Sequence, residues 1–254
     1  MSNIRIVAPF FPLPAEHEHH KALSDFDWIT AIRMLFDSAR RACGACPIHV
    51  ITDVSADLPL PTLRYETQHR RLMLWYLEAA VCYLASDDFD RDTVMLDSDQ
   101  LIYGDLSKWF EPDVDLGILA RDLPPKDPTG FRILNGVQFW SHRGKARLAA
   151  FYRQALALAQ TFSEDTIAWG ADTRVLEQLL EPLDVGATVD RAGVRVHMIP
   201  AEDVLERVTK RQLHQMRAGG RIELTRDVSC FRNMRKLHMK DFYRATLGEM
   251  AVMA

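Results

Sequence analysis

Short apolar runs alternate with longer segments of helical periodicity over the first 100 residues, and this alternation limits the fold more than any other feature. Residues 4–8, 48–52 and 93–96 are short, buried-type apolar runs. Between them, residues 27–41 carry apolar side chains at helical spacing, and residues 70–85 are apolar almost all round. The spacing predicts strands and helices in alternation. That order predicts an α/β fold with a mainly parallel central sheet and helices on both faces.

The rest of the chain continues this pattern without an internal repeat. A length of 254 residues suits one large domain, and 48% hydrophobic with 26% charged residues is typical of a soluble globular protein. We therefore expect a single domain over residues 1–254. Further strands are expected at 115–119, 137–140 and 194–199, and helices at 145–160, at 173–180 and from 201.

No segment has the pattern of a membrane span or an export signal. The most apolar stretch, residues 72–85, is shorter than the roughly 20 residues that cross a bilayer and contains Glu78. Residues 1–14 lack the charged-then-apolar layout of a signal peptide. We expect a cytoplasmic protein.

Charge is distributed unevenly along the chain. Residues 191–244 hold 13 Lys and Arg against 6 Asp and Glu, while the whole chain has a formal net charge of −4. A basic C-terminal segment on an acidic body predicts an anionic ligand more readily than nucleic acid, whose binders are usually basic overall. The alternative is a solvated basic face, or one that touches an anionic membrane surface.

In parallel sheets ligands bind beyond the carboxyl ends of the strands, which directs attention to Pro9, Asp53 and the segment Asp97-Ser98-Asp99. The chain has neither G-x-G-x-x-G nor a Walker loop. Of its five D-x-D pairs, only Asp97 and Asp99 directly follow a buried-type strand. Two carboxylates held there repel each other unless a cation joins them, and oxygen ligands suit Mg²⁺ or Mn²⁺. The alternative is a pair that caps a turn or a helix start.

The segment VMLDSDQLIYGDLSKWF resembles the D-x-D region of GT-A fold glycosyltransferases. The likeness is greatest to the retaining group that contains glycogenin and the bacterial lipopolysaccharide galactosyl- and glucosyltransferases. Gly104-Asp105-Leu106 matches the Gly-Asp-Leu that ends the pattern in that group. The resemblance implies the GT-A fold and transfer of a sugar from a nucleotide-diphosphate sugar, most readily a UDP-sugar, with retention. The acceptor would be a glycan, a lipid-linked sugar or a protein.

Three further segments follow in the order of that family. Residues 134–140 are similar to its FNSG(V) strand, and residues 169–176 to its DQ-x-x-L helix start. Residues 237–240 resemble its C-terminal H-F-x-G-x-x-K segment, although the usual glycine is absent. The resemblance implies that Asn135 faces the donor sugar and that Asp172 lies near donor and acceptor. Asn135 could instead form a turn, and Asp172 could cap the helix after it.

The resemblance also implies a metal site and a diphosphate site. A Mn²⁺ or Mg²⁺ ion would be held by Asp97, Asp99 and His238, and Lys240, with Arg244 or Arg235, would contact the diphosphate. The basic segment 191–254 would then close over the donor.

Other candidate residues carry weaker signals. Ser98 lies inside the motif, and Pro9 begins a Pro-Phe-Phe-Pro stretch where the family usually grips the nucleotide. Asp53 could contact the base or ribose, or be a loop acid. Arg70 and Arg71 could reach the diphosphate or be solvated at the helix start.

Two motifs resemble metal-binding sites, but the spacing of their residues does not favour metal binding. The Cys43–Cys46 pair has redox or zinc spacing, but it lies between a helix and a strand, where helix-end packing is the simpler interpretation. His17-Glu18-His19-His20 lacks the second histidine position of a zinc protease, so we expect a loop that could order over a substrate.

Two other functional classes remain as alternatives. A haloacid-dehalogenase-type phosphohydrolase also uses a D-x-D with Mg²⁺, but it expects the motif after its first strand and not at residue 97. A non-catalytic protein that binds a nucleotide-sugar or glycan is the other alternative. As a member of the glycosyltransferase family that it resembles, the protein would act in cell-surface polysaccharide assembly, in the cytoplasm or at the inner membrane face.

Overall fold

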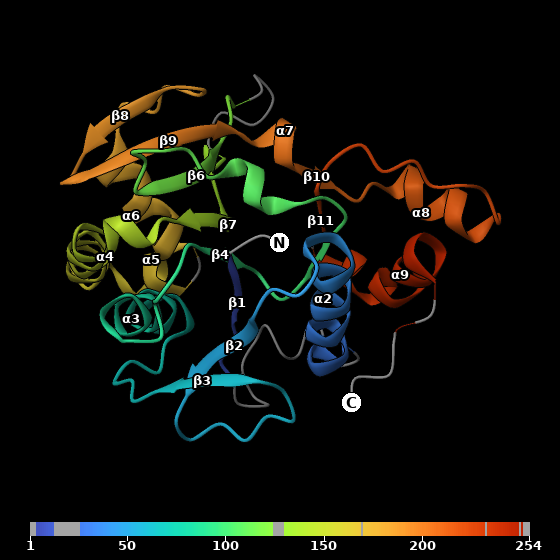
Figure 1. Ribbon diagram of the computed structural model, residues 1–254, viewed down its shortest axis with the longest axis horizontal. Coiled ribbons are helices and arrows are strands. Elements are labelled where there is room, and N and C mark those ends of the chain that lie inside the picture. The colour runs from blue at the N-terminus through green and yellow to red at the C-terminus, as the bar shows by residue number, and fades with distance from the viewer. Residues whose placement is uncertain are drawn as a thin grey trace.

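The computed structural model describes residues 4–12, 26–123, 130–168, 170–231, 233–248 and 250 (Figure 1). Its centre is an eight-stranded sheet. In spatial order the strands are β3 (Thr62–Tyr65), β2 (Ile48–Asp53), β1 (Arg5–Pro9), β4 (Thr93–Leu96), β7 (Ile133–Trp140), β6 (Leu116–Ala120), β9 (Val194–Pro200) and β8 (Thr188–Arg191).

Six of the eight strands run in the same direction, and β7 and β8 run against them. The mainly parallel sheet expected from the sequence is therefore confirmed. The reversed strand β7 lies in the middle, between β4 and β6. Because it is antiparallel to β4, it begins at the edge of the sheet where β4 ends.

Helices cover both faces of the sheet. The helices are α2 (Trp28–Cys43), α3 (Leu72–Ala85), α4 (Lys145–Ala159), α5 (Glu164–Ala168) and α6 (Ala171–Leu180). Neighbouring residues of β1 point to opposite cores: Val7 packs with α3, α4 and α6, whereas Ile6 packs with α2. In Figure 1, α3, α4 and α6 lie on one side and α2 on the other. This double covering explains why the strands are apolar on both faces.

A second, three-stranded sheet joins the C-terminal part of the chain to the segment after β4. It consists of β10 (Leu205–Arg207), β11 (Val228–Cys230) and β5 (Gln100–Ile102). Around it lie the short helix α7 (Ala201–Val204), α8 (Lys210–Arg217) and α9 (Met239–Leu247), and the 3-10 helices η1 (Leu106–Trp109) and η3 (Asn233–His238); η2 (His142–Gly144) precedes α4. The sheet brings the end of the chain beside the D-x-D motif.

Most expected elements are present, and the differences affect the site. Strand β7 begins at Ile133, earlier than the expected residue 137, so Asn135 lies inside a strand. Helix α6 begins at Ala171, and its N-cap is Gly170. The turn reading of Asn135 and the N-cap reading of Asp172 are therefore both wrong.

The cysteine pair packs at a helix end, as expected. Cys43 is the last residue of α2 and Cys46 precedes β2, and both side chains are buried thiols. Burial raises the pKa of the Cys46 thiol to about 11, which keeps it protonated at neutral pH. No described helix is long and apolar enough to cross a bilayer.

Candidate active site

A pocket of about 430 Å³ opens where β1 and β4 end and β7 begins. The pairing of β4 with β7 explains its position: Leu96 lies opposite Val137, and the next residue, Asp97, donates its backbone N–H to the Gly136 carbonyl at 2.9 Å. Pro9 at the end of β1 also lines the pocket. Residues from three distant parts of the chain therefore meet at one edge of the sheet.

The D-x-D motif forms one wall of this pocket. Asp97, Ser98 and Asp99, which directly follow β4, all line it. The backbone carbonyl of Asp99 accepts a 3.2 Å hydrogen bond from Phe231 N–H, which follows β11. The turn is thus fixed on one side by β7 and on the other by the C-terminal segment.

The side chain of Lys236 also lines the pocket. Its Nζ lies 2.7 Å from Asp99 Oδ2 and 4.7 Å from the centre of the Trp28 ring. Both side chains of the ion pair are about one-tenth exposed. At this depth the pair is little screened by solvent, and Lys236 neutralises part of the charge of the two aspartates.

Three buried polar atoms on the pocket residues have no hydrogen-bond partner among the residues that the structure describes. They are Asp99 Oδ1, Gln100 Oε1 and Trp75 Nε1. An unsatisfied buried polar group costs about 1–3 kcal/mol. Two acceptors and one donor of the lining residues thus remain for an ion, an ordered water or a polar ligand to satisfy.

Gly136 is required by close packing at the floor of the pocket. A Cβ atom there would lie 2.6 Å from Asp97 Oδ2 and 2.7 Å from Gln100 Nε2. Any larger residue would displace the carboxylate of Asp97. A glycine at position 136 therefore lets β7 pack closely against the D-x-D turn.

Asn135 and Asp172 form a buried pair at another wall of the pocket. Asn135 Nδ2 donates to Asp172 Oδ2 at 2.6 Å, and both residues are less than one-tenth exposed. Burial raises the pKa of the Asp172 carboxyl, and the hydrogen bond from Asn135 opposes this rise. The two residues implied to act on the donor sugar thus lie together, beside the D-x-D motif.

The structure does not bring the predicted His238 together with Asp97 and Asp99. Its Nε2 lies 3.0 Å from Arg217 Nη2 of α8. Within the described parts of the chain, no three His, Cys, Asp or Glu side chains are grouped to hold a metal ion. Lys240 and Arg244 are exposed on α9 and do not line the pocket.

Two further candidates are occupied by local contacts outside the pocket. Arg71 forms an ion pair with Glu164 of α5. Asp53 is 2% exposed and accepts hydrogen bonds from Ser55 and Thr67. Burial opposes ionisation of Asp53, but these hydrogen bonds outweigh it and hold its pKa well below the usual range. The geometry matches the loop-acid alternative, because Asp53 organises the turn after β2.

A divalent cation fits the residues that are present. Two carboxylates are hard oxygen ligands, and Asp99 Oδ1 is buried without a hydrogen-bond partner in the part of the chain that the structure describes. Mg²⁺ and Mn²⁺ are commonly held by one or two carboxylates, with waters and substrate phosphates as the other ligands. Asp97 and Asp99 would hold such an ion, and Asp99 would at the same time keep its ion pair with Lys236.

Sequence reasoning missed Lys236, Gln100 and Trp75. For Lys236 a signal was available: Met239, Phe242 and Tyr243 have the spacing of a buried helix face, which turns Lys240 outward. Trp75 lies in an apolar run typical of core, and Gln100, which directly follows Asp99, has no spacing of its own that marks it as a pocket residue. The His17–His20 motif, Trp169 and residues 124–129 lie outside the described residues.

No protein-family model matches the chain, and no curated protein matches it in sequence. Its structure is nevertheless similar to solved glycosyltransferases. One is a glycosyltransferase involved in the glycosylation of the major capsid of PBCV-1, with a TM-score of 0.56, 12% identity, and 94% of this chain and 99% of that one covered. The chain has the GT-A fold.

Two more solved structures agree with this assignment. The galactosyltransferase LgtC, solved with donor and acceptor sugar analogs, has a TM-score of 0.52 and 11% identity, with 96% of each chain covered. GlyE of Streptococcus pneumoniae TIGR4 has a TM-score of 0.54 and 11% identity, with 96% of this chain and 60% of GlyE covered. The fold implied by the D-x-D segment is confirmed, and the retaining subgroup stays a prediction.

Proposed function

We propose that this protein is a glycosyltransferase that moves a sugar from a nucleotide-diphosphate sugar to an acceptor. The observation that carries the proposal is the composition of one pocket in a GT-A fold. There the Asp97–Asp99 carboxylates, the Lys236 ammonium and the Asn135–Asp172 pair line one cavity, and three buried polar atoms of its lining residues have no hydrogen-bond partner among the described residues. A UDP-sugar is the first donor to test.

The diphosphate end of the donor belongs beside Asp97, Asp99 and Lys236. A Mn²⁺ or Mg²⁺ ion, when bound there, neutralises charge on the leaving nucleoside diphosphate. Lys236 adds a fixed positive charge where that leaving group develops. His238 would act as a third ligand only after separating from Arg217, and Lys240 and Arg244 would reach the donor only if α9 moved.

The sugar end belongs beside Asn135 and Asp172. Sugar hydroxyls both donate and accept hydrogen bonds, so they match the unpaired donor of Trp75 and the unpaired acceptor of Gln100. Phe11 and Trp75, whose ring centres are 5.0 Å apart, supply an aromatic wall for a sugar or base. Asp172 would stabilise positive charge at the reacting carbon of the sugar, with retention implied by resemblance alone.

The setting follows from the same proposal. The acceptor would be a glycan, a lipid-linked sugar or a protein, and nucleic acid is not expected as a partner. The single domain would work in the cytoplasm or at the inner membrane face, with the basic segment 191–254 closing over the donor.

No observation favours the phosphohydrolase alternative. The D-x-D follows the fourth strand in chain order, and Lys236 already occupies one oxygen of Asp99. A non-catalytic protein with the same pocket would bind the donor without releasing its sugar. Turnover separates that alternative from the enzyme.

The test is thermal unfolding with UDP, GDP, CDP and their sugars, with and without Mn²⁺. A ligand at 100 times its Kd stabilises the native state by about 2.7 kcal/mol. We expect a metal-dependent rise in Tm for one nucleotide, lost in Asp99→Asn. Asp113→Asn is the matched control, because Asp113 belongs to another D-x-D pair and lies outside this pocket. Absence of any shift would contradict the proposal, and a shift without release of sugar would support the non-catalytic alternative.

A further inference from the structure

A continuous chain of buried hydrogen bonds runs from the core to the pocket. Trp140 Nε1 donates to Gln138 Oε1 at 2.9 Å, and Tyr152 Oη contacts the same oxygen. Gln138 Nε2 contacts Asn135 Oδ1, and Asn135 Nδ2 donates to Asp172 Oδ2 at 2.6 Å. Trp140, Gln138 and Tyr152 are fully buried.

The direction of this chain is fixed by the indole of Trp140. An indole N–H only donates, so the atom of Gln138 beside it must be the oxygen. The amide nitrogen of Gln138 then faces Asn135, which must present its own oxygen to Gln138 and its amide nitrogen to Asp172. A flip of Gln138 would set two donors against each other at 2.9 Å.

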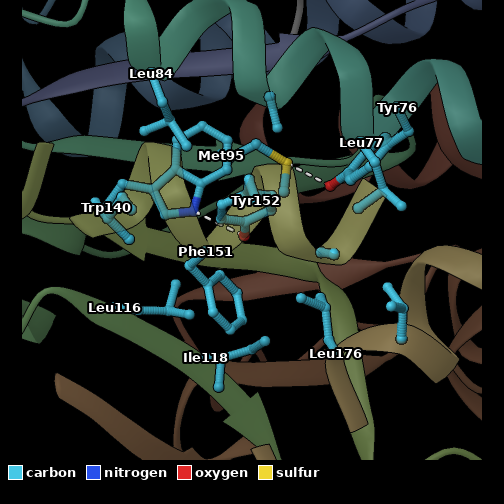
Figure 2. Close-up of a cluster of buried hydrophobic side chains, with 14 of the residues drawn as sticks. Tyr76, Leu77, Leu84, Met95, Leu116, Ile118, Trp140, Phe151, Tyr152 and Leu176 are labelled. Atoms are coloured by element: carbon cyan, nitrogen blue, oxygen red, sulfur yellow. Dashed lines mark hydrogen bonds between the residues drawn. The ribbon is translucent and has the colours of Figure 1, made fainter. Parts of the chain in front are cut away.

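The apolar surroundings leave few other ways to satisfy these groups. Trp140 Nε1 also lies 3.2 Å from Tyr152 Oη. Figure 2 shows this pair packed among Leu84, Leu116 and Phe151. Apolar residues of the same shape would avoid the cost of burying polar groups. A polar network is useful here because it sets the orientation of the Asn135 amide at the pocket.

The series of hydrogen bonds ends at Asp172, which accepts from Asn135 Nδ2. The titratable groups that face it are Tyr76 of α3 and Tyr152 of α4. Asp97, which also interacts with Tyr76, lies nearby. Tyr76 Oη donates to Met95 Sδ at 2.7 Å and Tyr152 Oη to Gln138, so both hydroxyls are engaged elsewhere. Among the described side chains, Asn135 donates a hydrogen bond to the Asp172 carboxylate.

We propose that Trp140, Tyr152 and Gln138 are positioning residues that hold the Asn135 amide with its N–H₂ toward Asp172, keeping Asp172 an ionised acceptor at the pocket. This role deepens the proposed function, because Asp172 is the group placed beside the donor sugar. None of the three residues lines the pocket. They act on the substrate only through Asn135 and Asp172.

Gln138→Glu removes the donor that faces Asn135, but it also adds a buried charge. The uncharged double variant Trp140→Phe with Tyr152→Phe is therefore measured beside it to isolate the direction of the hydrogen bonds. A glutamate accepts from Trp140 and Tyr152 at one oxygen and offers a second acceptor to Asn135. The Asn135 amide must then turn and set its oxygen against Asp172, which disfavours the ionised form. We expect the pKa of Asp172 to rise by about one unit or more, a tenfold change in proton affinity.

The pKa of Asp172 is read from the titration of its carboxyl carbon by NMR, with the resonance assigned by its loss in Asp172→Asn. Tyr83→Phe is the matched control, since the Tyr83 hydroxyl is also buried in this cluster and bonds Thr93 at 2.8 Å. The double variant Trp140→Phe with Tyr152→Phe removes both donors, and it also serves if Gln138→Glu fails to fold. Gln138 is then free to flip, and a rise in the pKa of Asp172 is again expected. An unchanged pKa in a folded variant would overturn the proposal.

Kinetics supply a second readout. With a donor that the enzyme turns over, Gln138→Glu should lower kcat about tenfold or more with little change in KM, while Tyr83→Phe leaves both unchanged. A change confined to KM would overturn the positioning role. The titration needs no turnover: a shifted pKa without any sugar release would support the hydrogen-bond chain and contradict the proposed function.

Discussion

Lys236 Nζ lies 2.7 Å from Asp99 Oδ2, so the basic C-terminal segment places one ammonium directly on the D-x-D motif. The two residues are 137 positions apart in the sequence. Their contact joins η3 to the end of β4 and makes the C-terminal segment part of the pocket wall.

Lys236→Met should destabilise the protein by about 3 kcal/mol, because it leaves a buried carboxylate without its partner. Urea unfolding measures the loss. Lys240→Met is the matched control: it is exposed, four residues away, and should change the free energy of unfolding by less than about 0.5 kcal/mol. Mn²⁺ should restore part of the Tm of Lys236→Met by supplying the missing charge. Equal losses in the two variants would contradict the importance of the ion pair.

Gly136→Ala should weaken donor binding more than it weakens the fold. Its Cβ would displace Asp97 and Gln100, at a cost in stability of about 1–3 kcal/mol. Gly117→Ala provides the comparison, because its Cβ would crowd Phe139 and Ile199 inside the sheet. Both variants should lose stability, but only Gly136→Ala should lose the nucleotide-induced rise in Tm. Normal nucleotide binding by Gly136→Ala would show that Asp97 is not needed.

Asp53→Asn should reduce stability by about 1–3 kcal/mol at neutral pH without affecting nucleotide binding. The folded pKa of Asp53 is lowered, so its stabilising effect is full above its unfolded pKa and is lost as pH falls through the folded value. Unfolding measured from pH 7 to pH 3 should show the difference from wild type shrinking below about pH 4. Loss of nucleotide binding in Asp53→Asn would support the alternative that Asp53 contacts the base or ribose.

Asp172→Asn should have the opposite pH dependence. The folded pKa of Asp172 is raised, so its contribution to stability is full below its unfolded pKa and is lost as pH rises through the folded value. At pH 7 to 8 the variant should therefore melt at a higher temperature than wild type, while sugar release is lost. Melting curves across pH 4 to 8 check the sign, and a variant that melts lower at pH 8 would contradict it.

The strands and helices were predictable wherever burial follows a local period. Strand β4 begins and ends where the apolar run does, and α2, α3 and α4 match their periodic segments to within about two residues. Strand β5, by contrast, is three residues long and depends on its partner β11. Such short strands have no local signal of their own.

Residues close together in the chain are enough to predict the alternating elements and the place of Asp97 and Asp99 at a strand end, and they also carry the GT-A resemblance. The tertiary structure decided which distant side chains meet them. Lys236 lines the pocket and Lys240 does not, since the buried face of α9 turns Lys240 to solvent. Asn135 lies beside Asp172 because β7 runs in the reverse direction. Contacts of this kind depend on how whole elements pack against one another. The local spacing of apolar residues carries no information about that packing.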